Sequence, residues 1–371
     1  MFDHYYKDKK VLVLGHTGFK GAWLTEWLLQ LGAQVSGVSS YVPSEPALFD
    51  VLGLNKRMQD YRCDIRDEQA LKKIMMSIQP EIVFHLAAQP IVKSSYADPK
   101  LTFDTNLSGT VNVLEAVRSC SSVCTAIMIT SDKCYDNVEW EYGYREDDRL
   151  GGKDPYSASK ACAEIAIKSY YESFFRDSSV KIASVRAGNV IGGGDWAAHR
   201  IVPDCMTAWS NNTSVDIRSP HATRPWQHVL EPLSGYLWLA RLLQSEQTTL
   251  INGESFNFGP NASMNYSVGV LIEALASVWG QGARWVSDTE NTHVAEAGLL
   301  KLCCDKALHY LNWQPTLSFS KTVDFTALWY HQYYQGKSML DFTRCQIEEF
   351  EKIAARQGIK WTQSVTQTSM V

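Results

Sequence analysis

Tyr156 and Lys160 stand four residues apart in the stretch Tyr-Ser-Ala-Ser-Lys. Residues at this spacing share one face of a helix, so the Lys160 ammonium can lie near the Tyr156 hydroxyl and lower a pKa that is ordinarily about 10. A tyrosinate that forms near neutrality is a general base for a sugar or alcohol hydroxyl whose carbon loses hydride to a nicotinamide. Many surface helices carry such a pair by chance, so this prediction depends on the surrounding motifs.

A glycine-rich turn follows the apolar run at 11–14 and precedes a helical pattern of apolar residues. Glycines at such a turn let the backbone approach a pyrophosphate, and the helix N-terminus offers unpaired N–H groups. A tight turn without a ligand is the alternative, but the position between strand and helix favours a dinucleotide site. The residues that we expect to contact the cofactor here are Gly15, Thr17, Gly18, Phe19, Lys20 and Gly21.

The acidic residue that usually holds the adenosine ribose after the second strand is missing, because Val38 is followed by Ser39. No arginine just beyond Ser39 offers a clamp for a 2′-phosphate, so the sequence favours NAD over NADP. Asp64 and Ile65 follow the next candidate strand, where we expect them to meet the adenine. Asp64 has an alternative interpretation as the N-cap of the following helix.

Ser131, Asp132 and Lys133 follow another apolar run, at 126–129, and combine a hydroxyl, an acid and a base. Taken alone they are typical of a turn in which Asp132 caps and Lys133 is solvated. A catalytic role needs Lys133 to be neutral part of the time, so its pKa would have to fall from about 10.4 through burial or nearby positive charge. His16 and His85 are predicted to be structural.

Short apolar runs alternate with helical patterns through the first half of the chain, which predicts a parallel sheet buried on both faces. After about residue 188, glycines and prolines separate shorter pieces. The predicted fold class is α/β, a Rossmann-type doubly wound parallel sheet with a smaller, irregular α/β substrate domain. We expect an NAD-binding domain at 1–188 with returning segments at about 229–250 and 310–335, a substrate-binding domain at 189–228 and 251–309, and a C-terminal helix and tail at 336–371.

The composition excludes several classes of protein. The chain has 371 residues, of which 45% are hydrophobic and 20% charged, so it can bury a large core. Its net charge of −5 and the lack of a basic block argue against nucleic acid as a partner. A polar N-terminus and the lack of a long apolar run predict a cytoplasmic protein without membrane contact. The nine cysteines lack Cys-x-x-Cys spacing and the histidines do not cluster, so we expect reduced thiols and no metal site.

Together these motifs resemble the extended short-chain dehydrogenase/reductase family of nucleotide-sugar enzymes. The resemblance covers residues 11 to about 260 and rests on the glycine turn, the Tyr156–Lys160 pair and the segments 86–90, 105–110, 130–133, 186–190 and 224–226. It implies that Tyr156 takes the proton of the sugar O4 and that Ser131 hydrogen-bonds the developing carbonyl. It adds these residues to the NAD site: Ser39, Leu86, Ala87, Ala88, Gln89, Thr105, Tyr156, Lys160 and Val190.

Within this family the pair Asp132-Lys133 resembles the 4,6-dehydratases, in particular those that act on CDP-glucose, rather than plain 4-epimerases. The resemblance implies that Lys133 is the base at C5 and Asp132 the acid at the C6 hydroxyl, with NAD oxidising C4 beforehand and returning the hydride to C6. The substrate-binding residues that it implies are Pro90, Ser131, Asn189, Arg200, Ile201, Arg224 and Asn261. Arg224 is expected on the diphosphate, whereas Arg200 has an alternative role as a surface charge. Glu296 falls where relatives have His-Glu-Ala, but Ala295 replaces that histidine and leaves the role open.

The resemblance also implies CDP-4-keto-6-deoxyglucose and water as products, a place in dideoxyhexose synthesis for lipopolysaccharide O-antigen, and a homodimer or homotetramer. Two alternatives stay open at this point. One is another nucleotide-sugar 4,6-dehydratase or 4-epimerase, and the other is an NAD-binding regulatory protein that kept the fold and lost catalysis. The intact Tyr156, Lys160, Asp132 and Lys133 argue against the regulatory protein.

Overall fold

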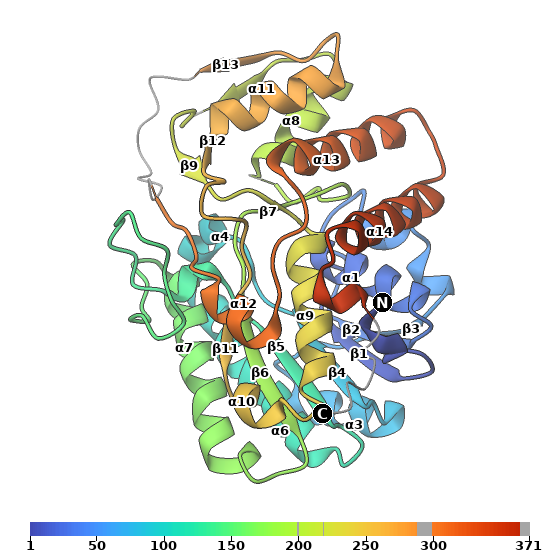
Figure 1. Cartoon of the computed structure of the whole chain (residues 1–371), viewed down its shortest axis with the longest axis vertical. Helices are drawn as coiled ribbons and strands as arrows, with labels where there is room; N and C mark the ends of the chain where they lie inside the picture. Colours follow the sequence, from blue (N-terminus) through green and yellow to red (C-terminus); the bar gives the residue numbers. More distant parts are fainter. Residues whose placement is uncertain (199, 218, 288–298, 364–371) are drawn as a thin grey trace, which may run out of the picture.

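The computed structural model describes residues 1–198, 200–217, 219–287 and 299–363. Its centre is a seven-stranded parallel sheet (Figure 1). In sheet order the strands are β11 (Ser255–Asn257), β6 (Lys181–Arg186), β5 (Thr125–Ile129), β4 (Ile82–His85), β1 (Lys10–Leu14), β2 (Gln34–Ser39) and β3 (Gln59–Arg62). The chain order reverses between β1 and β4, and Rossmann-type sheets bind ligands beyond the carboxyl ends of the strands at such a point.

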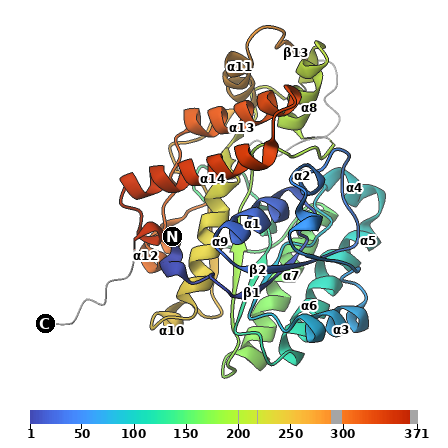
Figure 2. The ribbon, with the colours of Figure 1, turned by 90° about the vertical axis from the view of Figure 1, so that its right-hand side faces the viewer.

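Both faces of the sheet are buried, which explains the unbroken apolar runs in the sequence. Successive strand residues point to opposite faces, so Val11 and Val13 enter one hydrophobic core while Leu12 and Leu14 enter another. The first core includes residues of α1 (Phe19–Gln30), α9 (Leu230–Leu242) and α14 (Met339–Arg356), and the second includes residues of α3 (Glu68–Ile78), α6 (Gly109–Ser119) and α7 (Pro155–Tyr170). Figure 2 shows α9 and α14 on one side of the sheet and α3 and α6 on the other. The predicted fold class is confirmed.

Three two-stranded sheets and several helices form the smaller region at the top of Figure 1. The short strands are β7 (Val190–Ile191) with β10 (Gln227–His228), β9 (Thr223–Arg224) with β12 (Tyr266–Ser267), and β8 (Val215–Ile217) with β13 (Trp285–Ser287). The helices of this region are α8 (Ile201–Ser210), α11 (Val268–Trp279) and α13 (Phe319–Tyr334). The remaining helices are α2 (Leu48–Val51), α4 (Val92–Ala97), α5 (Pro99–Phe103), α10 (Thr248–Ile251) and α12 (Asp305–Leu311), with 3-10 or π segments η1 (Phe2–His4), η2 (Leu54–Lys56), η3 (Asp104–Ser108), η4 (Asp132–Cys134), η5 (Tyr171–Phe175) and η6 (Lys360–Thr362).

The domain limits drawn from the sequence stay a proposal, and two elements refine them. β11 comes from the segment 251–309 but pairs with β6 as the edge strand of the large sheet. α13 comes from the segment 310–335 but packs on α11 and α8 of the smaller region. The two regions are therefore interleaved more deeply than the proposed limits suggest.

Within the described ranges, no helix is both long and apolar enough to cross a membrane.

Candidate active site

The glycine turn joins β1 to α1 at the switch point of the sheet. Gly15 has φ +90°, and a Cβ there would lie 2.7 Å from the Ala87 nitrogen, so the fold itself needs this glycine. A Cβ at Gly18 would meet only the Gly15 carbonyl oxygen, at 3.4 Å, so no neighbour in the chain demands a glycine at this position. Gly18 is also the N-cap of α1 and offers no side chain to the first N–H groups of the helix. The turn thus leaves room in front of a helix N-terminus, where a dinucleotide diphosphate fits.

His16 packs against Ser39, the residue that the sequence predicts beside the cofactor ribose. The buried His16 ring bonds the Ser39 hydroxyl at 3.0 Å through Nδ1 and the Asp60 carboxylate at 2.8 Å through Nε2. Burial lowers the pKa of His16, although the Asp60 hydrogen bond opposes this. His16 thus links the Asp60 carboxylate on β3 to the Ser39 hydroxyl, and no sequence motif marks Asp60 as a candidate.

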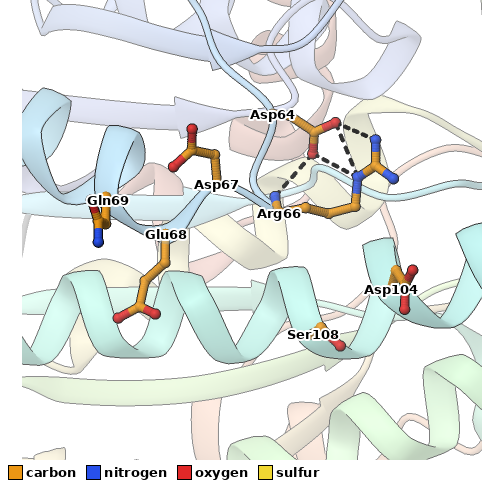
Figure 3. Close-up of a pocket in the computed structure, with 7 residues that line it drawn as sticks. All are labelled: Asp64, Arg66, Asp67, Glu68, Gln69, Asp104 and Ser108. Carbon is orange, nitrogen blue, oxygen red and sulfur yellow. Dashed lines mark hydrogen bonds and ion pairs between the residues drawn. The ribbon is translucent and has the colours of Figure 1, made fainter.

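Asp64 and Ile65 follow β3, and Asp64 lines an open surface hollow (Figure 3). The Asp64 carboxylate is held by Arg66, with Nη2 to Oδ2 at 2.7 Å, and this hydrogen bond lowers the pKa of Asp64. Asp67, rather than Asp64, caps α3 by accepting from the Ala70 N–H at 3.0 Å. The capping alternative for Asp64 is thus wrong, while its contact with adenine stays a prediction. Ile65 is buried in the core.

Ser131 organises the turn that follows β5. Its hydroxyl oxygen accepts from the Lys133 N–H at 3.2 Å, which caps η4, and the hydroxyl donates to Asp132 Oδ1 at 3.0 Å. Asp132 is buried and Lys133 half-buried, so Lys133 is not the fully solvated lysine of an ordinary surface turn. The hydroxyl, acid and base therefore leave the carboxyl end of a central strand together.

α7 presents Tyr156 and Lys160 to the same edge of the sheet. Asp154 caps the helix by accepting from the Ser157 N–H at 3.0 Å, and Pro155 begins it. Both Tyr156 and Lys160 are buried, and Tyr156 hydrogen-bonds Ser131. The two neighbouring elements thus bring the predicted catalytic hydroxyls together.

The predicted pKa of Tyr156 needs a correction. Burial raises it to about 12, and the Ser131 hydrogen bond and the Arg200 charge only partly offset this. Burial also lowers the pKa of Lys160 to about 8. The shared helix face was correctly inferred, but the sequence does not report how far burial outweighs the lysine charge.

Two further cations converge on this cluster. Lys20, half-buried on the first turn of α1, interacts electrostatically with Arg200, Asp132 and Lys160, and burial lowers its pKa to about 8. Arg200 pairs with Asp195 at 2.6 Å, and this pairing raises the Arg200 pKa although burial opposes it. Arg200 is therefore part of the cluster around Tyr156 and not a lone surface charge.

The loop after β4 is tied to α7 by Asn106. The Asn106 side chain accepts from the Gln89 N–H at 2.8 Å and donates to the Ser159 hydroxyl at 2.9 Å. Asn106 is buried and was not among the predicted site residues, although Thr105, which is half-buried beside it, was. This link positions the loop that carries Leu86, Ala87, Ala88, Gln89 and Pro90.

The remaining predicted substrate residues lie in or beside the smaller region. After β6 the chain passes through a short loop that contains Asn189, with φ +52°, to Val190 on β7, and Ile201 begins α8. Arg224 is half-buried on β9 and Asn261 is exposed in the loop after β11. Their substrate contacts stay predictions. Glu296 lies outside the described residues.

A family model described as GDP-mannose 4,6 dehydratase matches residues 12–326, and the chain belongs to this family of nucleotide-sugar dehydratases. It is 43% identical over 358 residues to the CDP-glucose 4,6-dehydratase of Salmonella typhimurium, covering 95% of this chain and 99% of that one. It is 23% identical to the UDP-glucose 4-epimerase of Mycoplasma pneumoniae, covering 88% and 97%. The solved UDP-glucose 4-epimerase of Thermus thermophilus, a complex with NAD, superposes with a TM-score of 0.73 at 23% identity, over 88% of this chain and 99% of that chain. The predicted family is confirmed.

Proposed function

We propose that this protein is a CDP-glucose 4,6-dehydratase that uses NAD and releases CDP-4-keto-6-deoxyglucose and water. The observation that carries the proposal is the turn Ser131-Asp132-Lys133 beside Tyr156, in a chain 43% identical over nearly its whole length to the Salmonella typhimurium enzyme. A plain epimerase needs no acid and base beyond the C4 machinery, so the buried Asp132 argues for the dehydratase.

The proposed NAD site is the turn in front of α1, where Gly18 leaves room for the diphosphate. The sequence-predicted residues around the turn, Ser39 and the loop after β4 would line the rest of it. When bound, NAD supplies the hydride acceptor for C4 and the hydride donor for C6. The buried Lys160 adds a cation next to this site.

At C4, Tyr156 accepts the proton of the sugar hydroxyl while Ser131 donates a hydrogen bond to the same oxygen. Both hydroxyls belong to one hydrogen-bonded pair, so a single sugar oxygen can meet both. The Arg200 charge stabilises the tyrosinate because it lowers the pKa of Tyr156. Proton removal by the chain and hydride removal from C4 together produce the 4-ketone.

The ketone makes the C5 proton acidic, and the turn after β5 supplies the groups for elimination. Lys133 takes the C5 proton, the C6–O bond breaks, and Asp132 gives a proton to the departing hydroxyl, which leaves as water. Lys133 then returns its proton to C5, and the hydride that bound NAD would supply at C6 completes the product. The reaction is redox-neutral overall, so no external oxidant is consumed.

For the CDP moiety we propose arginines of the smaller region. Arg200 and Arg224 provide planar guanidinium groups that suit bidentate contacts with a diphosphate. Arg200 already faces the Tyr156 cluster, so a diphosphate there would extend the sugar toward Ser131. Asn189, Ile201, Asn261 and Pro90 are proposed to complete the substrate site.

We propose a homodimer that pairs α7 and α6 with their copies, with a tetramer as a larger alternative. On α7, Ala158 and Cys162 are half-buried and Ile165 is 59% exposed, at the spacing of one helix face. Leu107 and Val111 add half-buried apolar surface on the adjoining helical segment. Light scattering of the purified protein measures the assembly.

The proposed substrate and cofactor are cytoplasmic metabolites, so we propose that the protein works in the cytoplasm. We also propose that its product serves dideoxyhexose synthesis.

Incubation of the purified protein with NAD and CDP-glucose should yield a 4-keto-6-deoxy sugar, detected by its alkali-dependent absorbance. Parallel incubations with dTDP-glucose and GDP-mannose test the nucleotide. Product from one of these sugars and none from CDP-glucose would overturn the CDP assignment and leave the dehydratase class. A CDP-sugar altered only at C4 would indicate an epimerase.

Lys133→Ala should abolish deuterium exchange at C5 and lower product formation roughly 10²–10⁴-fold, the usual contribution of a general base. NAD binding, measured by calorimetry, should be unchanged. The exposed Lys153, just before α7, provides the control variant Lys153→Ala, which should behave as wild type. C5 exchange that continues at full rate in the Lys133 variant would remove Lys133 from this role.

A further inference from the structure

The Asp132 carboxylate rests directly on the backbone of Gly188. A Cβ at residue 188 would overlap all three atoms of the carboxylate group, Cγ, Oδ1 and Oδ2. Gly188 is not among the residues with positive φ, so its backbone conformation does not require glycine. Glycine is needed here for lack of space, because the Asp132 carboxylate occupies the volume that a Cβ at residue 188 would fill.

The sheet register brings these two residues together. β5 and β6 are parallel neighbours in which Ile129 lies opposite Val185. Asp132 and Gly188 each lie three residues further along, so they leave the carboxyl edge of the sheet side by side. The parallel register of the two strands therefore explains why these two residues meet.

Gly188 cannot easily retreat from the carboxylate. Its carbonyl accepts from Gln227 Nε2 at 3.0 Å, and the same nitrogen donates to the Phe258 carbonyl at 3.0 Å. The Gln227 N–H also donates to the Asn189 carbonyl at 3.3 Å, and Gln227 is buried. Because three backbone segments hold this position, a side chain at residue 188 would have to displace Asp132.

We infer that residue 188 is a specificity-determining position, which decides whether a sugar oxidised at C4 goes on to lose water. Glycine at residue 188 leaves room for the Asp132 carboxylate, which the proposed mechanism places beside the C6 hydroxyl. A larger residue pushes the acid away and leaves only the C4 chemistry of Tyr156 and Ser131. This inference rests on the proposed function, because it takes Asp132 as the acid of the elimination.

A stability cycle tests the contact without any substrate. Gly188→Ala should lower the Tm of the wild-type chain, whereas in the Asp132→Ala background the same change should lower it far less, because the overlapping carboxylate is gone. Gly259→Ala is the matched control, since a Cβ at residue 259 makes only ordinary contacts, the closest at 3.4 Å from Cys304 Sγ. Equal losses of Tm for Gly188→Ala in both backgrounds would overturn the inference.

The activity of the same variant tests the consequence. With NAD and CDP-glucose, Gly188→Ala should still form NADH by oxidation at C4, while release of the 4-keto-6-deoxy product falls about 100-fold or more. Gly259→Ala should match wild type in both measurements. Product release at the wild-type rate by Gly188→Ala would overturn the specificity role. A wild-type chain that makes no product from CDP-glucose would instead overturn the proposed function, and the stability cycle would still decide whether residue 188 places Asp132.

Discussion

Tyr156→Phe should lower the rate of product formation roughly 10²–10⁴-fold, because it removes the proton acceptor for the C4 hydroxyl. The phenyl ring keeps the shape of the buried side chain, so the affinity for CDP-glucose should change little. The loss should fall on the first half-reaction, and NADH should not appear in a single turnover. In contrast, Lys133→Ala should leave NADH formation intact and stop the reaction after it.

The pH dependence follows from the pKa of Tyr156. Burial raises that pKa to about 12 in the chain itself, so the tyrosinate fraction increases as the pH rises through neutrality. The rate of C4 oxidation should therefore rise with pH on its acid limb. The positive charge of oxidised nicotinamide favours the tyrosinate, so bound NAD should move this limb to lower pH.

Difference absorbance of tyrosinate between wild type and Tyr156→Phe, with and without NAD, measures this pKa directly. Tyr170→Phe is the matched control because Tyr170 ends the same helix, is half-buried, and hydrogen-bonds Glu115 away from the turn after β5. It should keep the activity and pH profile of wild type. A Tyr156→Phe variant within tenfold of the wild-type rate would remove Tyr156 from the role of base.

The fold was predictable because its cause is local and periodic. The apolar run at 11–14 is unbroken because both faces of β1 are buried, and the same reasoning located β2, β4, β5 and β6. The return of β11 to the large sheet was not predictable, since a three-residue strand carries no periodic signal. The smaller region was not predictable in detail, because its short strands pair with strands far away in the sequence, as β8 does with β13.

The site was predictable where a motif holds residues close in sequence, as for Tyr156 with Lys160 and for Ser131 with Asp132. It was not predictable where distant segments meet. The His16 bond to Asp60 joins residues that are 44 positions apart, and the Gly188 contact with Asp132 depends on sheet register. The direction of the Tyr156 pKa shift also required the degree of burial.

Glu164→Ala should destabilise the fold by about 3–5 kcal/mol, because it leaves a buried arginine without its counterion. Arg186 donates to Glu164 Oε2 at 2.8 Å, and the two side chains are 3% and 2% exposed. Glu164 also accepts hydrogen bonds from Thr130 and Ser184, so it ties α7 to the ends of β5 and β6. Thr130 directly precedes Ser131, and the Glu164 charge supports the protonated form of Lys160. Loss of this carboxylate should therefore weaken the whole edge that carries the proposed catalytic groups.

Urea unfolding of Glu164→Ala and Glu164→Gln measures this effect, the second variant preserving the side-chain shape if the first folds poorly. Glu68→Ala, which breaks the half-buried surface pair with Lys72, should cost only about 0–1 kcal/mol. Burial alone would raise the pKa of Glu164, but Arg186 holds it below 4.5, so the carboxylate stabilises the native state above pH 4.5 and ceases to do so as the pH falls through its native pKa. For this reason the difference in the free energy of unfolding between wild type and Glu164→Gln should become smaller in acid. If at neutral pH the Glu164 variants lose no more free energy of unfolding than Glu68→Ala, the buried pair does not hold the catalytic edge together.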